Sequence, residues 1–159
     1  MEKLMAKAKA IEEKLPEVAE RTVNRACEEG KEIIFEKAQN MRYGHDYLEQ
    51  EKKAYQESFV TKATRKGKRI VGYIQTNNPH AVYAENGTGV VGSQNPNTAI
   101  KGWEYDVNQH GEKGWNYFAD GKFHHTKGLP AFKIYYSTGQ ELRKRIKEIF
   151  KEEMKGYKG

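Results

Sequence analysis

The sequence predicts an α+β fold, in which an antiparallel sheet is packed by a long N-terminal helix and a C-terminal amphipathic helix. Apolar residues recur at helical spacing near both ends of the 159-residue chain. β-Branched and aromatic residues dominate residues 58–76 between them. Residues 87–128 hold both tryptophans and eight glycines, which predicts a long Trp- and Gly-rich β insertion. The length predicts one domain, residues 1–159.

Residues 1–57 form the predicted helical N-terminal part. Residues 2–15 are rich in Lys, Glu, Ala and Leu, and Pro16 is expected to break or kink this helix and to begin a second one. An apolar stripe at spacings of three and four then predicts a helix of about 25 residues. Its members are Ala19, Val23, Ala26, Cys27, Ile33, Ile34, Ala38 and Met41. Cys27 is expected to be a buried thiol, Gly30 to allow a bend or a close contact, and residues 43–57 to hold a short amphipathic helix.

Residues 58–86 predict a β-hairpin and the segment that follows it. Residues 58–61 and 69–76 have strand composition, and residues 65–68 form a basic turn. Basic residues cluster at this tip and are candidates for contact with DNA or an acidic partner, the alternative being a solvated face. They are Lys62, Arg65, Lys66, Lys68 and Arg69. Tyr83 and Glu85 are expected on one side of an extended segment.

Residues 87–128 predict a projecting small β-meander. Residues 103–107 and 115–118 flank a Gly-containing turn. Asp120-Gly121 then predicts a tight hairpin, because a type I′ turn needs positive φ at both central positions. We expect residues 90–127 to be mobile in an isolated subunit and ordered in an assembly, since fixing many glycines costs chain entropy.

Residues 129–159 predict a last strand and a C-terminal helix. Ser137 and Gln140 have the spacing of a capping box, so the helix is expected to begin there. Its apolar stripe consists of Leu142, Ile146, Ile149, Phe150 and Met154.

Composition and motifs argue against several functions. No run approaches about 18 apolar residues, the N-terminus has no signal-peptide pattern, and one cysteine allows no internal disulfide. No metal-ligand spacing or nucleophile motif is present, and Gly87-Thr88-Gly89 lacks the rest of a phosphate loop. The histidines are expected to be surface or hydrogen-bonded side chains: His45, His80, His110, His124 and His125. We therefore expect no catalytic, cofactor-binding or metal-binding residues and no cofactor.

Two segments carry a family resemblance. Residues 78–89 read Asn-Pro-His-Ala-Val-Tyr-Ala-Glu-Asn-Gly-Thr-Gly, and residues 128–131 read Gly-Leu-Pro-Ala before the last helix. With the tryptophans between them, this order resembles the tail-completion, or head–tail joining (tail terminator), family of long-tailed bacteriophages. The chain departs from the family at residues 132–134, where Phe-Lys-Ile replaces Arg-Pro-Phe, and at Asn86, where relatives have Phe or His.

The resemblance implies a structural virion protein and no enzyme. Members form a ring, usually described as hexameric, at the head–tail junction of the virion, after synthesis in the cytoplasm of the host bacterium. The ring completes the tail and joins it to the neck. The implied partners are further copies of the chain, the tail tube protein, a neck or stopper protein and, non-specifically, packaged double-stranded DNA. No membrane partner is implied.

Candidate residues for contacts between subunits or rings come from the spacing of Tyr83 and Glu85 beside the Gly-Thr-Gly element and from the large apolar surface of the tryptophans. They are Tyr83, Glu85, Gly87, Thr88, Gly89, Trp103 and Trp115. For Glu85 the alternative is a structural hydrogen bond within the subunit, and for the tryptophans it is packing on their own subunit. Two other functions stay open: a neck or stopper protein of the same particle, and a small basic nucleic-acid-binding accessory protein.

Overall fold

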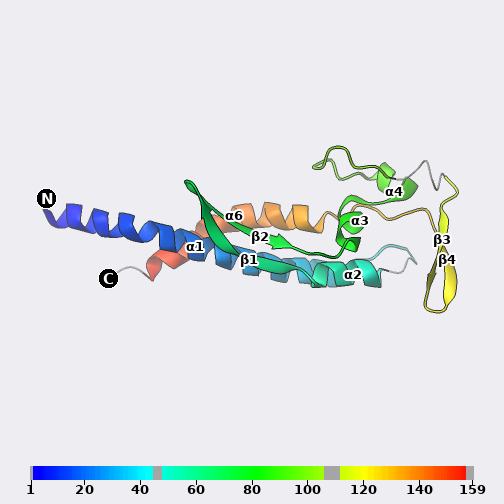
Figure 1. Ribbon diagram of the computed structural model, residues 1–159, viewed down its shortest axis with the longest axis horizontal. Helices are drawn as coiled ribbons and strands as arrows, with labels where there is room; N and C mark the ends of the chain where they lie inside the picture. Colours follow the sequence, from blue (N-terminus) through cyan, green and yellow to red (C-terminus); the bar gives the residue numbers. More distant parts are fainter. Residues whose placement is uncertain (1, 45–47, 106–111, 157–159) are drawn as a thin grey trace. The chain divides into compact units, whose positions relative to one another are not determined.

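The computed structural model describes residues 2–44, 48–105 and 112–156 and confirms the α+β class (Figure 1). Two two-stranded antiparallel sheets, β1–β2 and β3–β4, stand in place of one larger sheet. The chain packs into two compact units, and two of the four boundaries between them fall inside the first and last helices. Unit 1 comprises residues 1–32, 59–75 and 139–159, and unit 2 comprises residues 33–58 and 76–138. The elements are α1 (Glu2–Gln39), α2 (Glu49–Gln56), β1 (Phe59–Lys66), β2 (Arg69–Gln75), α3 (His80–Asn86), α4 (Gly89–Gln94), β3 (Trp115–Ala119), β4 (Lys122–Thr126) and α6 (Ile134–Lys155).

Unit 1 packs the predicted β1–β2 hairpin with parts of α1 and α6. The strands pair from Phe59 with Gln75 to Lys66 with Arg69, and the register shifts between Thr61 and Thr64. The amide of Ala63, inside this irregularity, donates to Asn24 Oδ1 of α1 at 2.7 Å. A helix side chain therefore satisfies a strand amide where the ladder is interrupted.

Close packing in unit 1 depends on two glycines. A Cβ atom at Gly72 of β2 would lie 2.8 Å from both Cys27 Sγ and Val23 Cγ1 of α1. At Gly30 it would lie 2.6 Å from Ile74 Cδ1 and Leu142 Cδ1, so the predicted close contact is present. Cys27 is buried as predicted, and burial raises the pKa of its thiol.

Two arginines fix the register of α6 against α1. Arg25 bonds Glu152 at 2.6 Å and Glu29 at 3.1 Å. Arg145 bonds Glu29 and Glu152, each at 3.3 Å. The hydrogen bond from Arg25 holds the pKa of Glu152 below its usual value. Because these side chains are partly exposed, the network orients the helices more than it stabilises them.

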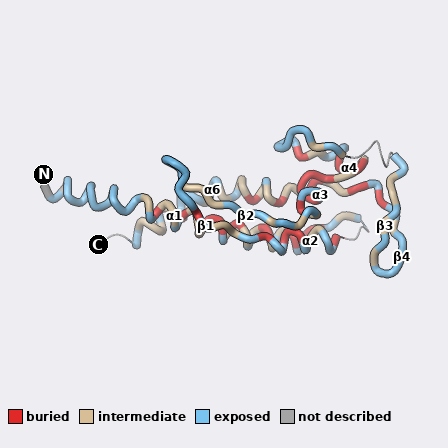
Figure 2. Tube along the Cα trace, viewed as in Figure 1, coloured by how far each residue is buried: buried red, intermediate tan, exposed pale blue. Residues whose placement is uncertain are grey.

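Helix α1 contradicts the predicted break at Pro16, because the helix continues through this residue. The residues around Pro16 are exposed, and burial along α1 begins at Val18 (Figure 2). Proline leaves one helical carbonyl without its backbone donor. In an exposed turn this carbonyl can bond water instead, so the helix continues at a small cost in free energy.

The start of α6 also differs from the prediction. The helix begins at Ile134, so Ser137 lies inside it and donates to the Ile134 carbonyl at 3.1 Å. Lys37 Nζ donates to the same hydroxyl at 2.8 Å. Ser137 is therefore not the N-cap, and the predicted capping box is wrong.

The middle of the chain is more helical than predicted. Residues 80–86 form the helix α3, so the predicted extended segment around Tyr83 and Glu85 is wrong. Residues 89–94 form a second short helix, α4. Residues 103–105 form no strand, and residues 106–107 of that predicted strand lie outside the described residues. The β3–β4 hairpin is confirmed, with positive φ at Asp120 (52°) and Gly121 (75°). In the part of the chain that the structure describes, no helix is long and apolar enough to cross a membrane.

Replacing Gly72 with Ala should destabilise unit 1. The new methyl group would overlap Val23 and Cys27, and overpacking of this kind costs about 1–3 kcal/mol. The control is Gly139→Ala in α6, where nothing lies within 4 Å of the added Cβ atom. That change should raise the free energy of unfolding by up to about 1 kcal/mol through helix propensity. Urea denaturation measures both changes, and a neutral Gly72→Ala would contradict this account of the packing.

Candidate functional site

The two segments that carry the family resemblance pack against each other in unit 2. The Thr88 amide donates to the Leu129 carbonyl at 2.9 Å, and the Leu129 amide donates to Thr88 Oγ1 at 3.0 Å. The Phe132 amide donates to the Ala84 carbonyl at 2.9 Å. Residues about 40 positions apart in the sequence therefore form one hydrogen-bonded junction.

Glycine is required on both sides of this junction. Gly87 has φ of 81°, and a Cβ atom there would lie 2.9 Å from the Ala131 nitrogen and from the Leu129 oxygen. Gly128 has φ of 106°, and a Cβ atom there would collide with the Thr88 carbonyl. A side chain at either position would meet backbone, which cannot move aside as a flexible side chain can.

Glu85 lies beneath this junction, 7% exposed, and its carboxylate caps the N-terminus of α6. The amides of Tyr135 and Tyr136 donate to its two oxygens at 2.9 and 2.8 Å. The hydroxyl of Tyr55, from α2, donates to Oε2 at 2.9 Å. A carboxylate at this end of a helix satisfies unpaired amides and interacts favourably with the helix dipole. Burial, and then the Glu85 carboxylate, raise the pKa of Tyr55 above its usual value.

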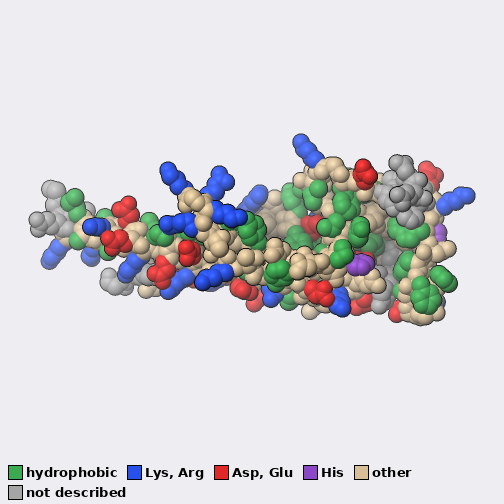
Figure 3. Space-filling view, in the orientation of Figure 1, with side chains coloured by type: hydrophobic (Ala, Val, Ile, Leu, Met, Phe, Trp, Pro, Cys, Tyr) green, Lys and Arg blue, Asp and Glu red, His purple; other side chains and the backbone are tan. Residues whose placement is uncertain are grey.

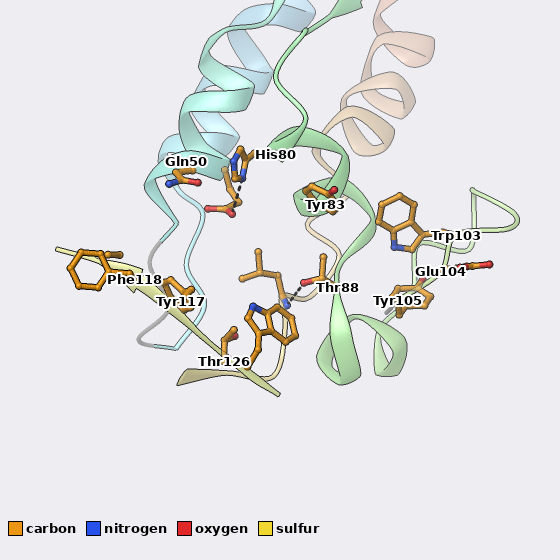
Figure 4. Close-up of a pocket in the computed structure, with 14 residues that line it drawn as sticks. Gln50, His80, Tyr83, Thr88, Trp103, Glu104, Tyr105, Tyr117, Phe118 and Thr126 are labelled. Carbon is orange, nitrogen blue, oxygen red and sulfur yellow. Dashed lines mark hydrogen bonds and ion pairs between the residues drawn. The ribbon is translucent and has the colours of Figure 1, made fainter. Parts of the chain in front are cut away.

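A pocket of about 430 Å³ opens beside the junction in unit 2 (Figure 4). Its lining includes four of the predicted interface residues, namely Tyr83, Thr88, Trp103 and Trp115. The rings of Tyr83 and Trp103 have centroids 6.1 Å apart, and Trp103 Nε1 donates to the Gly87 carbonyl at 2.9 Å. Trp103 thus packs on its own unit, which was the alternative to an interface role.

The other three predicted interface residues do not line the pocket. Gly87 and Gly89 are buried in the backbone junction, and Glu85 is engaged as the cap of α6. The structural alternative for Glu85 is therefore the one that the hydrogen bonds support. Tyr83, at 46% exposure, remains accessible on α3.

The predicted basic residues lie in unit 1, on the β1–β2 hairpin. All five are exposed: Lys62, Arg65, Lys66, Lys68 and Arg69. Figure 3 shows Lys and Arg side chains gathered around this hairpin tip. The structure thus confirms an exposed basic tip, while its ligand stays a prediction.

Sequence analysis missed several pocket residues. Tyr105, Tyr117 and Phe118 line the pocket, and their aromatic character within residues 103–118 was the available signal. Glu51 and His80 also line it, with Glu51 Oε1 3.5 Å from His80 Nδ1. Nothing in the sequence pairs a residue of α2 with one at the start of α3, so this contact needed the fold.

The described residues offer no group of three or more His, Cys, Asp or Glu side chains that could hold a metal ion. His124 stacks on Tyr117 with centroids 5.3 Å apart and lies 3.2 Å from the Ala119 carbonyl. His125 pairs with Asn116 Oδ1 at 3.1 Å. His45 and His110 lie outside the described residues.

Removing the Glu85 carboxylate should destabilise the chain strongly. Glu85→Ala leaves one buried hydroxyl and two partly buried amides without their acceptor, which should lower the free energy of unfolding by about 2–5 kcal/mol. The exposed Glu104 is the matched control, and Glu104→Ala should change it by less than about 0.5 kcal/mol. Circular dichroism during urea denaturation distinguishes them, and equal stability of the two variants would refute the capping role.

Stability should fall at alkaline pH, and Tyr55 should contribute to that fall. The unfolded chain releases the Tyr55 proton near the usual pKa of 10.0, whereas the folded chain retains it. The contribution of neutral Tyr55 is therefore complete below pH 10 and is lost as the pH rises above it. In Tyr55→Phe the fall should be shallower yet present, since burial also raises the pKa of Tyr135. Denaturation midpoints between pH 8 and about 11.5 measure the slopes, and identical slopes would exclude Tyr55 as a cause.

A comparison of this chain with protein-family models, curated proteins and solved structures gives no match.

Proposed function

We propose that this chain is a tail-completion protein, a structural virion protein that forms a ring at the head–tail junction of a long-tailed bacteriophage. The observation that carries the proposal is the junction between residues 87–89 and 128–131. These are the two segments on which the family resemblance depends. They hydrogen-bond to each other, and each needs glycine where they meet, which would explain why both motifs occur in one chain. The same junction adjoins the capped start of the last helix, as the family order requires.

Exposed aromatic side chains on unit 2 support an assembly role. Phe118 and Phe123 face each other across the β3–β4 hairpin with ring centroids 5.3 Å apart. They are 64% and 77% exposed. Paired exposed phenylalanines are costly in water and are typical of surfaces that become covered by a partner. In a ring this patch would meet a different patch on the neighbouring subunit, because ring contacts are heterologous.

The basic hairpin tip fits a second contact in the same particle. Its five exposed cationic side chains would meet an acidic surface of the tail tube or neck protein, or the phosphates of packaged DNA. The same tip favours a second candidate function, a small nucleic-acid-binding accessory protein. The two functions differ in oligomeric state and in dependence on DNA, which makes them separable.

Purified protein, alone or with tail tubes added, should form closed rings through the aromatic hairpin. Light scattering should give a mass several times 18.3 kDa, and negative-stain electron microscopy should show annuli. Replacing Phe118 and Phe123 with Ser should abolish rings while the chain stays folded, because both side chains are exposed and a cross-strand aromatic pair contributes only about 0.2–1 kcal/mol. The control is Phe59→Ser, a change of the same type on β1 in unit 1 at 37% exposure, which should leave rings intact.

The competing outcome is equally specific. A chain that stays monomeric with tail tubes and binds duplex DNA with steep salt dependence would support the accessory function and contradict the ring. Immunogold labelling of particles from a phage that encodes this chain provides the direct test. Label at the head–tail junction supports the proposal, and label elsewhere overturns it.

A further inference from the structure

The aromatic pocket of unit 2 contains a carboxylate whose charge is not fully compensated. The Glu51 side chain is only 13% exposed, and its Oε2 atom is buried without a hydrogen-bond partner among the described residues. Its Oε1 atom lies 3.5 Å from His80 Nδ1, a pair that is ionic only when the imidazole is protonated. A carboxylate that is shielded from water and lacks a full set of hydrogen bonds is stabilised by a cation placed beside it.

Aromatic rings surround the space that this carboxylate lines. Six contribute to the lining: Tyr83, Trp103, Tyr105, Trp115, Tyr117 and Phe118. In Figure 4, Trp103 and Tyr105 lie on one side of the space, Tyr117 and Phe118 on the other, and His80 and Tyr83 between them. The faces of Trp and Tyr rings attract cations, and pockets that recognise alkylammonium groups are built from such rings.

The charges of the described lining residues argue against an anionic ligand. Among the 14 lining residues that the structure describes, the carboxylates are Glu51 and Glu104, and none is Lys or Arg. An anion would meet carboxylates, and a neutral apolar ligand would leave Glu51 shielded from water without a partner. The volume of about 430 Å³ lies within the usual range of ligand pockets.

We propose that this pocket binds an organic cation, the guanidinium or alkylammonium group of an arginine or lysine side chain. The group would lie beside the Glu51 carboxylate, with its stem and charge against the rings. Two sources could supply this group: a small free cation, or a basic side chain of a protein. The five exposed basic residues at the tip of a second copy's β1–β2 hairpin are candidates for the latter. The site stands whether or not the chain forms rings.

The two tryptophans of the chain both line the pocket, so their fluorescence reports directly on binding. N-acetylarginine amide should change the emission saturably, while the uncharged isostere N-acetylcitrulline amide should bind at least about tenfold more weakly. Equal binding of the two compounds, or no saturable change with the arginine compound, would overturn the proposal.

Matched variants test the residues. Glu51→Gln should weaken arginine binding about tenfold, whereas Glu49→Gln, on the same helix at 64% exposure, should leave it unchanged. If Glu51→Gln fails to fold by circular dichroism, Tyr83 supplies the test. Tyr83→Leu should weaken arginine binding and Tyr83→Phe, which keeps the ring, should retain it. Unchanged binding in folded Glu51→Gln, or in Tyr83→Leu, would exclude the proposed contacts.

A third comparison identifies the source of the cation. In one variant all five basic residues of the hairpin tip are changed to Gln. If a second copy supplies the side chain, this variant should no longer self-associate, although it should still bind N-acetylarginine amide. In the parent chain, N-acetylarginine amide should inhibit self-association. If the source is a free cation or another protein, self-association is unaffected by either change. Arginine binding by a chain that never assembles would support the pocket and contradict only the ring.

Discussion

The carboxylate of Glu85 is the interaction on which unit 2 depends most. It joins α2, α3 and α6 through a tyrosine hydroxyl and two backbone amides. Each of these donors is costly to bury alone, and a single anion at the start of α6 satisfies them together. The cap is supplied from 50 residues earlier in the chain, so the position where the last helix begins is a tertiary property. The rings of Tyr55 and Tyr135 also pack against each other in a tilted arrangement, with centroids 5.3 Å apart.

The glycine junction places the pocket relative to this cap. Thr88 contacts Leu129 with both its backbone and its hydroxyl, so α3 and the segment before α6 cannot slide past each other. Tyr83 and His80, which lie on α3, are thereby held at the pocket, while Glu85 on the same short helix points into the core. One helix of seven residues therefore serves both the structural cap and the accessible surface.

Sequence analysis predicted the elements whose causes are local. The apolar stripes of α1 and α6, the β1–β2 hairpin and the Asp120-Gly121 turn follow from spacing and from backbone preference. Sequence analysis failed where a residue far away in the sequence determines the local structure. Ser137 had the spacing of a cap, but Glu85 fixes the start of α6 three residues earlier. Tyr83 and Glu85 alternate as in a strand, yet the junction holds residues 80–86 as a helix. The Glu51–His80 pair had no sequence signal at all, because only the fold brings α2 beside α3.

Both units are built from segments that lie far apart in the sequence, which affects folding during synthesis. Unit 1 is assembled from three separated segments and unit 2 from two, and both include residues beyond 130. As synthesis proceeds from the N-terminus, the apolar stripe of α1 emerges more than 100 residues before α6 can cover it, and Glu85 emerges before the amides that it caps. Long-range closure of this kind slows folding and leaves the nascent chain exposed to association. Loss of the last 21 residues would remove one of the three segments of unit 1, so a ribosome that stops early releases a chain without a complete core.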